Sequence, residues 1–408
     1  MRWGIAFLIS AAIAISYLDR QTFPWAIGAI RKDIRISNEA KATLDSAFLA
    51  TYGLMYLGGG WLLDKLGTRR GFLLVMIFWS LACAAHGLAG GLFALGACRL
   101  LLGMGEGGGF PAATRAVAEW FPVKERSTAM GIINGGTGVG GVVAPPLIAL
   151  ILLRVQWLDL SPWRWVFFLT GSLGVLWAIW WWLFYFPPAP TAMSSQTPSG
   201  SAIGLRDLLR FREIWAVMGA KFLTDAAWYF YIFWLPNYLL TAWKFDIQHA
   251  TAVGWIPYAA SGVGCLCGGA LSSWLLRRGG SVNRSRKWAL GASAALMPWV
   301  MLVPVLPNIG WVIAIFSLAF FGQQSWSTLI MVLPTDLVPR EAVGRVAGLV
   351  GLGGAFGGVV LGQLAGYLLD HGFTYAPILC IAASLHVVAF VLICLVIRVL
   401  QPLPFPAK

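Results

Sequence analysis

Charged residues are scarce in this sequence. Asp, Glu, Lys and Arg make up 11% of the 408 residues, whereas hydrophobic residues make up 59%, and the mean hydropathy is +0.75. A water-soluble domain carries roughly 25% charged residues. The shortage of charge therefore predicts a protein whose surface faces lipid.

Cysteine and histidine are also rare, and their spacing supports no metal site. The six cysteines all lie in apolar stretches, and Cys265 and Cys267 form a C-x-C pair without a second pair, so we expect neither a zinc site nor a disulfide framework. The four histidines are scattered, and no motif positions a serine beside one of them. We therefore expect no metal, no cofactor and no enzyme activity.

Long runs without charge occur throughout the chain, for example Gly71–Cys98, Trp288–Thr335 and Gly372–Ile397. A membrane span needs about 20 apolar residues, and lipid requires that backbone polar groups bond within helices or a closed barrel. Barrel strands would show alternating segments of about ten residues instead. The pattern predicts an all-α integral membrane protein with twelve transmembrane helices, at 3–29, 42–66, 70–89, 92–119, 126–152, 163–186, 214–240, 251–277, 287–306, 309–334, 343–369 and 373–398.

Basic residues are distributed unequally between the two sides of these spans. With the N-terminus in the cytoplasm, 18 Lys and Arg residues fall on the cytoplasmic side and seven, including Lys41, on the other. Cytoplasmic loops carry such an excess, so we expect both termini in the cytoplasm. The same bias explains the net charge of +13 without a nucleic-acid partner, because no basic tract with interleaved aromatics exists.

The chain divides into two halves of six spans each. We place the halves at 1–186 and 213–408, with a cytoplasmic linker at 187–212 that begins rich in Pro and Ser. An internal repeat at an offset of 217 residues supports this division, since Glu119, Pro122, Gly131, Gly140 and Gly141 map onto Asp336, Pro339, Gly348, Gly357 and Gly358. Parallel repeats of this kind place a binding site near the bilayer midplane and work by alternating access.

Asp19 and Arg20 interrupt the apolar run of the first span. A charge at the bilayer centre costs ~2.5–3.5 kcal/mol on insertion scales, so two such residues indicate a function. One reading is a neutralising pair that anchors the helix. The other is a protonatable carboxylate beside a guanidinium that receives an anion, because an arriving anion would change the charge balance at Asp19.

Arg99 and Glu106 lie seven residues apart in the fourth span, which puts them on one helix face about 10 Å apart. That is too far for a direct pair, so each needs another partner, which we expect to be Asp19, Arg20, the substrate or water. A guanidinium matches a carboxylate in bidentate geometry. Glu106 alternatively forms a salt bridge that locks two helices. The glycines around it, Gly103 to Gly109, favour close helix packing over a phosphate-binding loop.

The sequence also resembles a known family over nearly its whole length. Gly60-x-x-x-Asp64-Lys65-x-Gly67-x-Arg69-Arg70 resembles the loop between spans 2 and 3 of the major facilitator superfamily. Tyr17-Leu18-Asp19-Arg20, Arg99-x6-Glu106 and Glu119-Trp120-Phe121-Pro122 resemble the anion:cation symporter branch, and the segment 222–236 is similar to its hexuronate transporters. This resemblance implies a major facilitator fold of two six-helix pseudo-repeats, in which Asp19 and Glu106 carry protons.

The expected substrate ligands combine the buried arginines with aromatic and neutral polar side chains. Tyr17 and Tyr52 correspond to substrate-facing tyrosines of the resembling proteins. Trp228 and Tyr229 either stack on a sugar or simply lie at a membrane interface, and Gln323 is the counterpart of Glu106 at the repeat offset. The full set is Tyr17, Arg20, Tyr52, Arg99, Thr137, Trp228, Tyr229, Gln323 and Gln324.

A third set of charged residues is expected to form salt bridges that gate the pathway. Lys221 and Asp225 are four residues apart in the seventh span and predict an ion pair, either structural or lining the pathway. The remaining charges stabilise one conformation or belong to a solvated topogenic loop. The full set is Asp64, Lys65, Arg69, Arg70, Arg115, Glu119, Arg126, Lys221 and Asp225.

These features together predict a proton-coupled secondary transporter that imports a monoanionic sugar acid, a hexuronate or aldonate. We expect a monomer in the bacterial inner membrane, whose partners are the organic anion, H⁺ and the lipid bilayer, with the proton gradient as its energy source. The alternative is an exporter or exchanger of another organic anion. Proton antiporters of the superfamily carry G-x-x-x-G-P-x-x-G-G in span 5, whereas Gly135–Gly141 here contains no proline. A membrane receptor is the less favoured alternative, because it would call for an appended soluble domain, whereas the tails and loops here are short.

Overall fold

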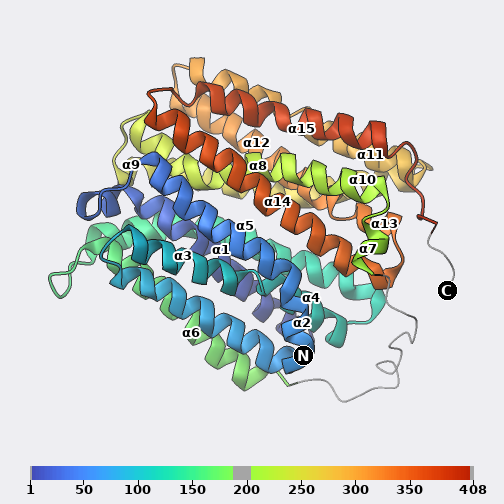
Figure 1. Ribbon diagram of the computed structural model, residues 1–408, viewed down its shortest axis with the longest axis horizontal. Coiled ribbons are helices and arrows are strands. Elements are labelled where there is room, and N and C mark those ends of the chain that lie inside the picture. The colour runs from blue at the N-terminus through green and yellow to red at the C-terminus, as the bar shows by residue number, and fades with distance from the viewer. Residues whose placement is uncertain (1, 187–203, 405–408) are drawn as a thin grey trace. The chain divides into compact units, whose positions relative to one another are not determined.

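The computed structural model describes residues 2–186 and 204–404, and within these ranges every regular element is a helix (Figure 1). The described chain forms two compact units. Unit 1 comprises the described residues of Met1–Thr197 with Ile232–Trp255, and unit 2 those of Pro198–Tyr231 with Ile256–Lys408. The predicted division into 1–186 and 213–408 stays a prediction, and residues 187–203 of the predicted linker lie outside the described ranges.

Unit 1 is built from seven α-helices, one short 3₁₀ helix and the end of an eighth long helix. Its elements are α1 (Arg2–Asp33), α2 (Asn38–Ala85), η1 (His86–Leu88), α3 (Leu92–Glu106), α4 (Gly109–Trp120), α5 (Val123–Arg154), α6 (Pro162–Phe184), α9 (Ile247–Gly254) and the last residues of α8 (Arg212–Thr241). Within it, α2 packs mainly on α3 and α6, and α1 packs on α5.

Unit 2 contains the beginning of α8 and the C-terminal helices. Its further elements are α7 (Leu205–Leu208), α10 (Ile256–Arg277), α11 (Val282–Ala294), η2 (Pro298–Val305), α12 (Ile309–Ile330), α13 (Leu333–Leu337), α14 (Arg340–Asp370) and α15 (Ala376–Val396). A buried apolar core joins α8, α11, α12, α14 and α15 around residues such as Val217, Trp326 and Ile393.

Nine helical segments in the described part of the chain are long and apolar enough to cross a membrane. They coincide with nine of the twelve predicted spans. The other three, at 42–66, 92–119 and 214–240, are helical as well, in the first part of α2, in α3 with α4, and in α8. Charged side chains are buried in each of these three, namely Asp45, Arg99 with Glu106, and Lys221 with Asp225, which lowers their hydropathy.

The predicted break between spans 2 and 3 coincides with a kink, whereas the fourth predicted span differs from the helices observed. Spans 2 and 3 are joined in α2, where Gly67 takes a φ of 72° between two helical stretches, a conformation that glycine adopts readily. The fourth span is broken after Glu106, and α4 begins at Gly109. The break places Glu106 at the end of a helix.

Glycines allow the helices of both units to approach closely, in a way that repeats along the chain. A Cβ atom on Gly136 or Gly140 of α5 would lie 2.2 Å from a backbone oxygen of α1, at Ser10 and Ala14. A Cβ on Gly357 of α14 would lie 1.9 Å from the Phe222 oxygen of α8. Because Gly140 and Gly357 are separated by the repeat offset of 217 residues, the packing of α5 on α1 is repeated in that of α14 on α8.

This packing predicts a strong effect of a single methyl group at Gly140. We expect Gly140→Ala to cost about 1–3 kcal/mol of stability through overpacking, and so to lower the melting temperature of the detergent-solubilised protein. Gly131→Ala, on the same helix, meets nothing within 4 Å and should keep or slightly raise that temperature, because alanine is the better helix former. Equal melting temperatures for the two variants would contradict the close approach of α5 to α1.

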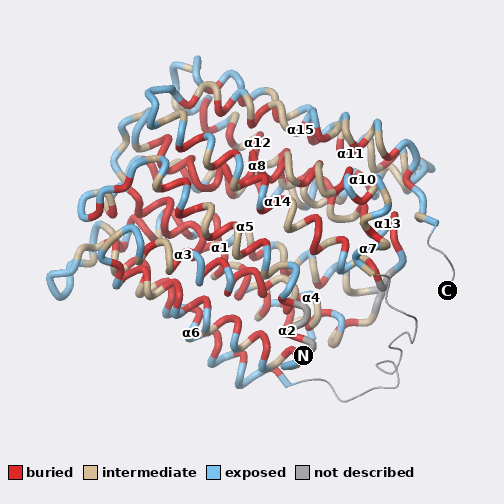
Figure 2. Tube along the Cα trace, viewed as in Figure 1, coloured by how far each residue is buried: buried red, intermediate tan, exposed pale blue. Residues whose placement is uncertain are grey.

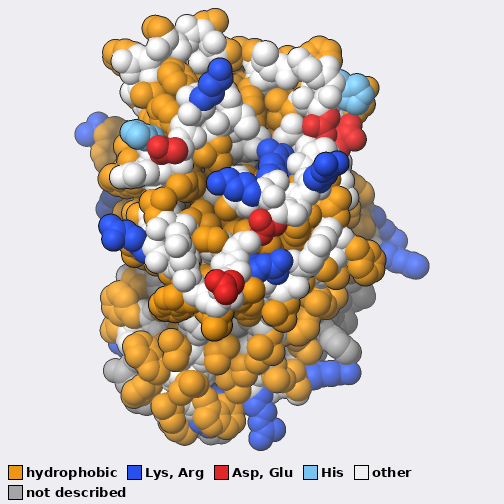
Figure 3. Space-filling view, turned by 90° about the vertical axis from the view of Figure 1, so that its left-hand side faces the viewer, with side chains coloured by type: hydrophobic (Ala, Val, Ile, Leu, Met, Phe, Trp, Pro, Cys, Tyr) orange, Lys and Arg blue, Asp and Glu red, His pale blue; other side chains and the backbone are white. Residues whose placement is uncertain are grey.

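The outer surface of the helices is apolar. Buried and exposed positions alternate along the helices (Figure 2), yet large hydrophobic side chains occupy many exposed positions, for example Trp180, Leu183 and Phe184 on α6. The face drawn in Figure 3 carries hydrophobic side chains beside a group of Lys, Arg, Asp and Glu side chains. A water-soluble monomer rarely exposes such continuous apolar area, so the helices present a surface suited to lipid, as the composition predicts.

Candidate functional site

Arg20 of α1 and Glu106 of α3 form a buried ion pair in unit 1. The Arg20 Nη2 atom lies 3.0 Å from Glu106 Oε2, and both side chains are at most 1% exposed. Ser16 also donates a hydrogen bond to Glu106 Oε2, at 2.9 Å. The second carboxylate oxygen, Oε1, is buried and has no hydrogen-bond partner. Glu106 therefore meets one of the partners expected from the sequence, and one of its oxygens remains available.

Asp19, next to Arg20 in the chain, lies in a different environment. Its side chain is fully buried, and neither carboxylate oxygen has a hydrogen-bond partner. Polar groups of Trp79, Cys83 and Thr170 face it but do not meet hydrogen-bond geometry. An ionised carboxylate without a partner is costly to bury, so the position suits a carboxyl group that carries a proton.

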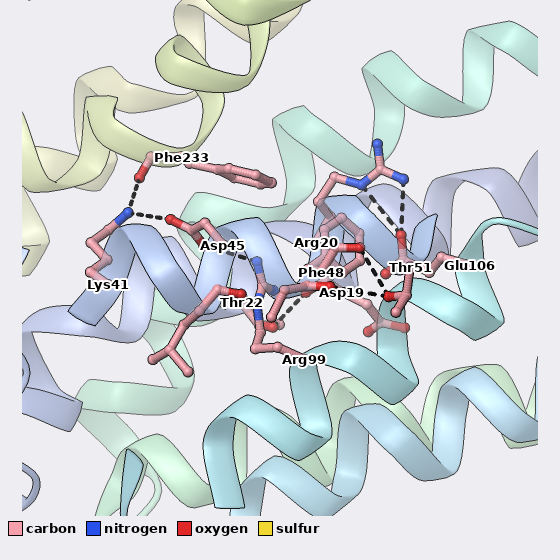
Figure 4. Close-up of polar contacts among 12 residues, drawn as sticks. Asp19, Arg20, Thr22, Lys41, Asp45, Phe48, Thr51, Arg99, Glu106 and Phe233 are labelled. Carbon is pink, nitrogen blue, oxygen red and sulfur yellow. Dashed lines mark hydrogen bonds and ion pairs between the residues drawn. The ribbon is translucent and has the colours of Figure 1, made fainter. Parts of the chain in front are cut away.

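Arg99 pairs with Asp45, a partner that the sequence prediction did not name. Arg99 Nη2 lies 2.9 Å from Asp45 Oδ1, and Lys41 Nζ lies 2.7 Å from Asp45 Oδ2, with all three side chains at most 3% exposed. Lys41 also donates to the backbone oxygen of Phe233, at 3.0 Å. Figure 4 shows this triad beside the Arg20–Glu106 pair.

Aromatic rings surround both guanidinium groups. The guanidinium carbon of Arg20 lies 4.7 Å from the ring centroid of Tyr17 and 4.6 Å from that of Tyr52. The ring of Phe48 lies 5.3 Å from the Arg20 carbon and 4.6 Å from the Arg99 carbon, so it contacts both. Cation–π contacts of this kind help to hold a buried guanidinium in a fixed orientation.

The structure thus joins the predicted residues Tyr17, Arg20, Tyr52 and Glu106 in one cluster, and adds Lys41, Asp45 and Phe48 to it. Lys41 was assigned to an outer loop, but it is fully buried in α2. The signal for Asp45 was present, because Lys41 and Asp45 have the i,i+4 spacing of an ion pair at the start of a predicted span. Phe48 gave no signal, since an apolar residue in an apolar helix is unremarkable.

A second polar cluster lies in unit 2. The predicted pair of Lys221 and Asp225 is confirmed, with Nζ and Oδ1 2.9 Å apart, and Lys221 also donates to Ser327 at 2.9 Å. Gln323 donates to Asp225 at 3.4 Å, and its carbonyl oxygen is hydrogen-bonded to His386. The network therefore crosses α8, α12 and α15, and His386 is a member that its scattered sequence position did not reveal.

The remaining predicted substrate ligands lie on α5, α8 and α12. Trp228 and Tyr229 are buried on α8, and the Trp228 ring contacts Phe320. Gln324 is partly buried on α12. Thr137 donates to the backbone oxygen of Asn134 at 2.8 Å, within α5. Their roles in binding stay predictions.

Of the predicted gating residues of unit 1, Arg115 pairs with Glu119, and Arg69 and Arg126 donate to backbone oxygens. Arg115 lies 3.2 Å from Glu119, and Tyr185 donates to Glu119 at 2.6 Å. Arg69 donates to the backbone oxygen of Trp182 at 2.7 Å. Arg126 donates to the Ala118 and Phe121 oxygens, not to Glu119.

Three further predicted gating residues flank the kink of α2 at Gly67. Lys65 and Arg70 are exposed. The side chain of Asp64 is not among the side chains that the structure describes. In unit 2 the repeat counterpart of Glu119, Asp336, pairs with Arg286 at 3.0 Å. A carboxylate at this position is therefore bound by an arginine in both units.

A cavity of about 550 Å³ lies elsewhere in unit 1, between α5 and α9. Arg154 is the one charged residue among its lining residues, which include Pro146, Leu150 and Trp255. None of the predicted ligands lines it. The chemistry of unit 1 is therefore concentrated in the buried charges of α1, α2 and α3.

Comparison with known proteins gives relatives over almost the whole chain. The model of the family described as Major Facilitator Superfamily matches residues 9–362. The hexuronate transporter of Escherichia coli K12 is 27% identical over 400 residues, which cover 94% of this chain and 91% of that protein. A protein of the same strain named "Probable galactarate/D-glucarate transporter" is 28% identical over 403 residues, 90% of this chain and 87% of that protein.

A solved structure supports the fold. The inward-facing, occupied crystal structure of a bacterial homologue of the human lysosomal transporter Spinster superposes with a TM-score of 0.73 at 19% sequence identity. The match covers 97% of this chain and 95% of that one. Similarity at this identity concerns the fold alone, so the substrate must be argued from the buried residues.

Proposed function

Because this chain belongs to the major facilitator superfamily, we propose that it is a proton-coupled transporter that imports a monoanionic sugar acid, a hexuronate or an aldonate. Membership makes the protein a multi-pass membrane transporter and not an enzyme. The substrate, the proton and the direction of transport are the parts that we propose. The names of the relatives support a sugar acid.

The observation that carries the proposal is the buried pair of Arg20 and Glu106. The guanidinium group of Arg20 can bind a substrate carboxylate with the same geometry as it binds Glu106. When Glu106 takes a proton, its attraction to Arg20 weakens, and the carboxylate of a substrate replaces it. When the substrate leaves, Glu106 returns its proton and binds Arg20 again. Proton binding and anion binding are thereby linked through one arginine.

Asp19 is proposed as the second proton-carrying group. It has no hydrogen-bond partner and lies next to Arg20, so its charge and that of the substrate act on the same neighbourhood. Two acids near one anion site would let a proton accompany each anion while the buried charge changes little. This balance is favourable in a low-dielectric interior.

The sugar part of the substrate is proposed to contact neutral groups. Tyr17 and Tyr52, whose rings lie against Arg20, carry hydroxyl groups suited to a polyol. Thr137, Trp228, Tyr229, Gln323 and Gln324 remain proposed contacts, with Gln323 held by Asp225 and His386. We further propose a monomer in the bacterial inner membrane with both termini in the cytoplasm, and gating by the charges around Glu119 and by the Lys221–Asp225 pair.

The proposal is tested by Glu106→Gln, measured in proteoliposomes with labelled D-glucuronate. The amide keeps the shape of the side chain but neither takes up nor releases a proton. We expect accumulation driven by an inward pH gradient to be abolished, while exchange of labelled for unlabelled glucuronate continues. Uptake by the wild-type protein should rise several-fold when the gradient is imposed.

The matched control is Glu125→Gln, which removes a partly exposed carboxylate paired with Arg2. An exposed ion pair contributes about 0–1 kcal/mol, so this variant should accumulate glucuronate as the wild type does. Gradient-driven accumulation by Glu106→Gln at the wild-type level would sink the coupling role of Glu106.

A further inference from the structure

The triad of Lys41, Asp45 and Arg99 differs from the Arg20–Glu106 pair in its number of cations. Asp45 receives Lys41 at one oxygen, at 2.7 Å, and Arg99 at the other, at 2.9 Å (Figure 4). Glu106 meets a single cation at one oxygen and leaves the other oxygen without a partner. To bind Arg99, a substrate carboxylate would have to displace Asp45, which is held by cations at both of its oxygens. Displacing Glu106 from Arg20 breaks one charged contact.

The backbone also holds the triad in place. Arg99 Nε donates to the Leu44 oxygen at 3.3 Å, and Lys41 donates to the Phe233 oxygen at 3.0 Å. Lys41 Nζ lies 4.1 Å from the ring centroid of Trp234. Arg99 is therefore fixed, and Asp45 occupies the position that a ligand carboxylate would take.

Asp45 is the counter-ion of two buried cations. Among the described residues of unit 1, the buried side chains of Asp, Glu, Lys and Arg are three acids and three bases, namely Asp19, Asp45, Glu106, Arg20, Lys41 and Arg99. Glu106 pairs with Arg20, and the position of Asp19 suits a protonated carboxyl group, so Asp45 is the acid that neutralises Lys41 and Arg99. Buried cations without a counter-ion are unfavourable, so without the charge of Asp45 these two would attract an anion.

We propose that Asp45 determines how many carboxylates the transported acid carries. By occupying Arg99, Asp45 leaves Arg20 as the one guanidinium open to a ligand carboxylate, so the site accepts a monoacid and rejects a dicarboxylate. The inference rests on the proposed function, since it specifies the acid bound at Arg20. Arg99 Nη1, which is buried and has no hydrogen-bond partner, remains to donate to a neutral hydroxyl group.

The geometry answers a question that overall similarity leaves open. A hexuronate carries one carboxylate, whereas galactarate and glucarate carry two. The relatives named for these acids are 27% and 28% identical to this chain, so identity favours neither. Phe48 contacts both guanidinium groups, so Arg20 and Arg99 lie around one aromatic ring, near enough for the two carboxylates of one small acid.

The test is competition for binding of labelled D-glucuronate to the purified protein. The competitors are D-gluconate and D-glucarate, which have the same carbon chain and differ by one terminal carboxylate. For the wild type we expect unlabelled glucuronate and gluconate to compete, and glucarate to compete at least about tenfold less well. For Asp45→Asn we expect glucarate to improve relative to glucuronate by about 10–100-fold, the range that a hydrogen bond to a charged group gives.

Two further variants separate selectivity from loss of folding. Lys41→Met keeps the pair of Asp45 and Arg99 and should retain the preference for monoacids. The double variant Lys41→Met/Asp45→Asn keeps the net charge of the wild type yet frees Arg99, and should accept glucarate as Asp45→Asn does. It provides the same readout if Asp45→Asn is obtained in poor yield.

The failures of the two proposals are distinguishable. A wild-type protein that binds glucuronate and glucarate equally well overturns this inference alone, as do variants lacking Asp45 that bind glucuronate but keep the wild-type preference. A wild-type protein that binds neither acid overturns the proposed function and this inference with it.

Discussion

Replacing Arg20 by Met is expected to abolish glucuronate uptake, reducing it at least about 100-fold. Among the described side chains, Arg20 is the one cation within ion-pair distance of Glu106, and it is the guanidinium that we propose to bind the substrate. Removing one partner of a buried pair costs about 3–5 kcal/mol, because the other charge is left unpaired. The variant should therefore also give less folded protein, measured by gel filtration in detergent.

The double variant Arg20→Met/Glu106→Gln separates the two effects. Removing both charges should restore the folded yield, since no unpaired charge remains, while uptake stays absent because no guanidinium receives the carboxylate. Arg2→Met is the control, as it breaks an exposed pair with Glu125. Uptake by the folded double variant would contradict the role of Arg20 as the substrate ligand.

Asp225→Asn is expected to destabilise unit 2 by about 3–5 kcal/mol, by the same argument. The change leaves the buried ammonium of Lys221 without its counter-ion, although the ammonium keeps its hydrogen bond to Ser327. Larger substitutes are unsuitable, because a Cβ atom at the facing Gly354 would already lie 2.3 Å from Asp225 Oδ2. The measurement is the melting temperature of the purified protein.

The companion variant Lys221→Met/Asp225→Asn should recover most of the loss. If the pair is structural, this double variant also transports glucuronate at close to the wild-type rate. If the pair gates the pathway, stability returns but transport does not. A melting temperature of Asp225→Asn equal to that of the wild type would show that Lys221 is not held in place by Asp225.

Much of the fold follows from the sequence for physical reasons. Apolar runs long enough to cross a membrane leave few alternatives to helices. The repeat offset relates Gly140 to Gly357, and the structure shows that both lie at close helix contacts. The break at Gly67 falls between the predicted spans 42–66 and 70–89. The break after Glu106 was harder to predict, because it lies in a run of glycines inside a predicted span, where hydropathy records no boundary.

The site was predictable where a charge had no local partner. Arg99 and Glu106 are too far apart to pair, so each had to find a side chain on another helix, and Glu106 does so in Arg20. The partner of Arg99 was missed because Lys41 and Asp45 stand near a helix end. There, a sequence pattern does not distinguish a buried pair from loop charges. Asp19 is the opposite case. A basic residue, Arg20, follows it in the chain, yet its carboxylate oxygens have no hydrogen-bond partner.

The coupling of protons to a sugar acid is measured most directly with a pH indicator trapped inside proteoliposomes that contain the purified protein. An inward gradient of D-glucuronate, imposed without a pH gradient, should acidify the interior as the anion and H⁺ enter together. The acidification should be absent with Glu106→Gln. Entry of labelled glucuronate into wild-type proteoliposomes without any change in internal pH would contradict proton-coupled import.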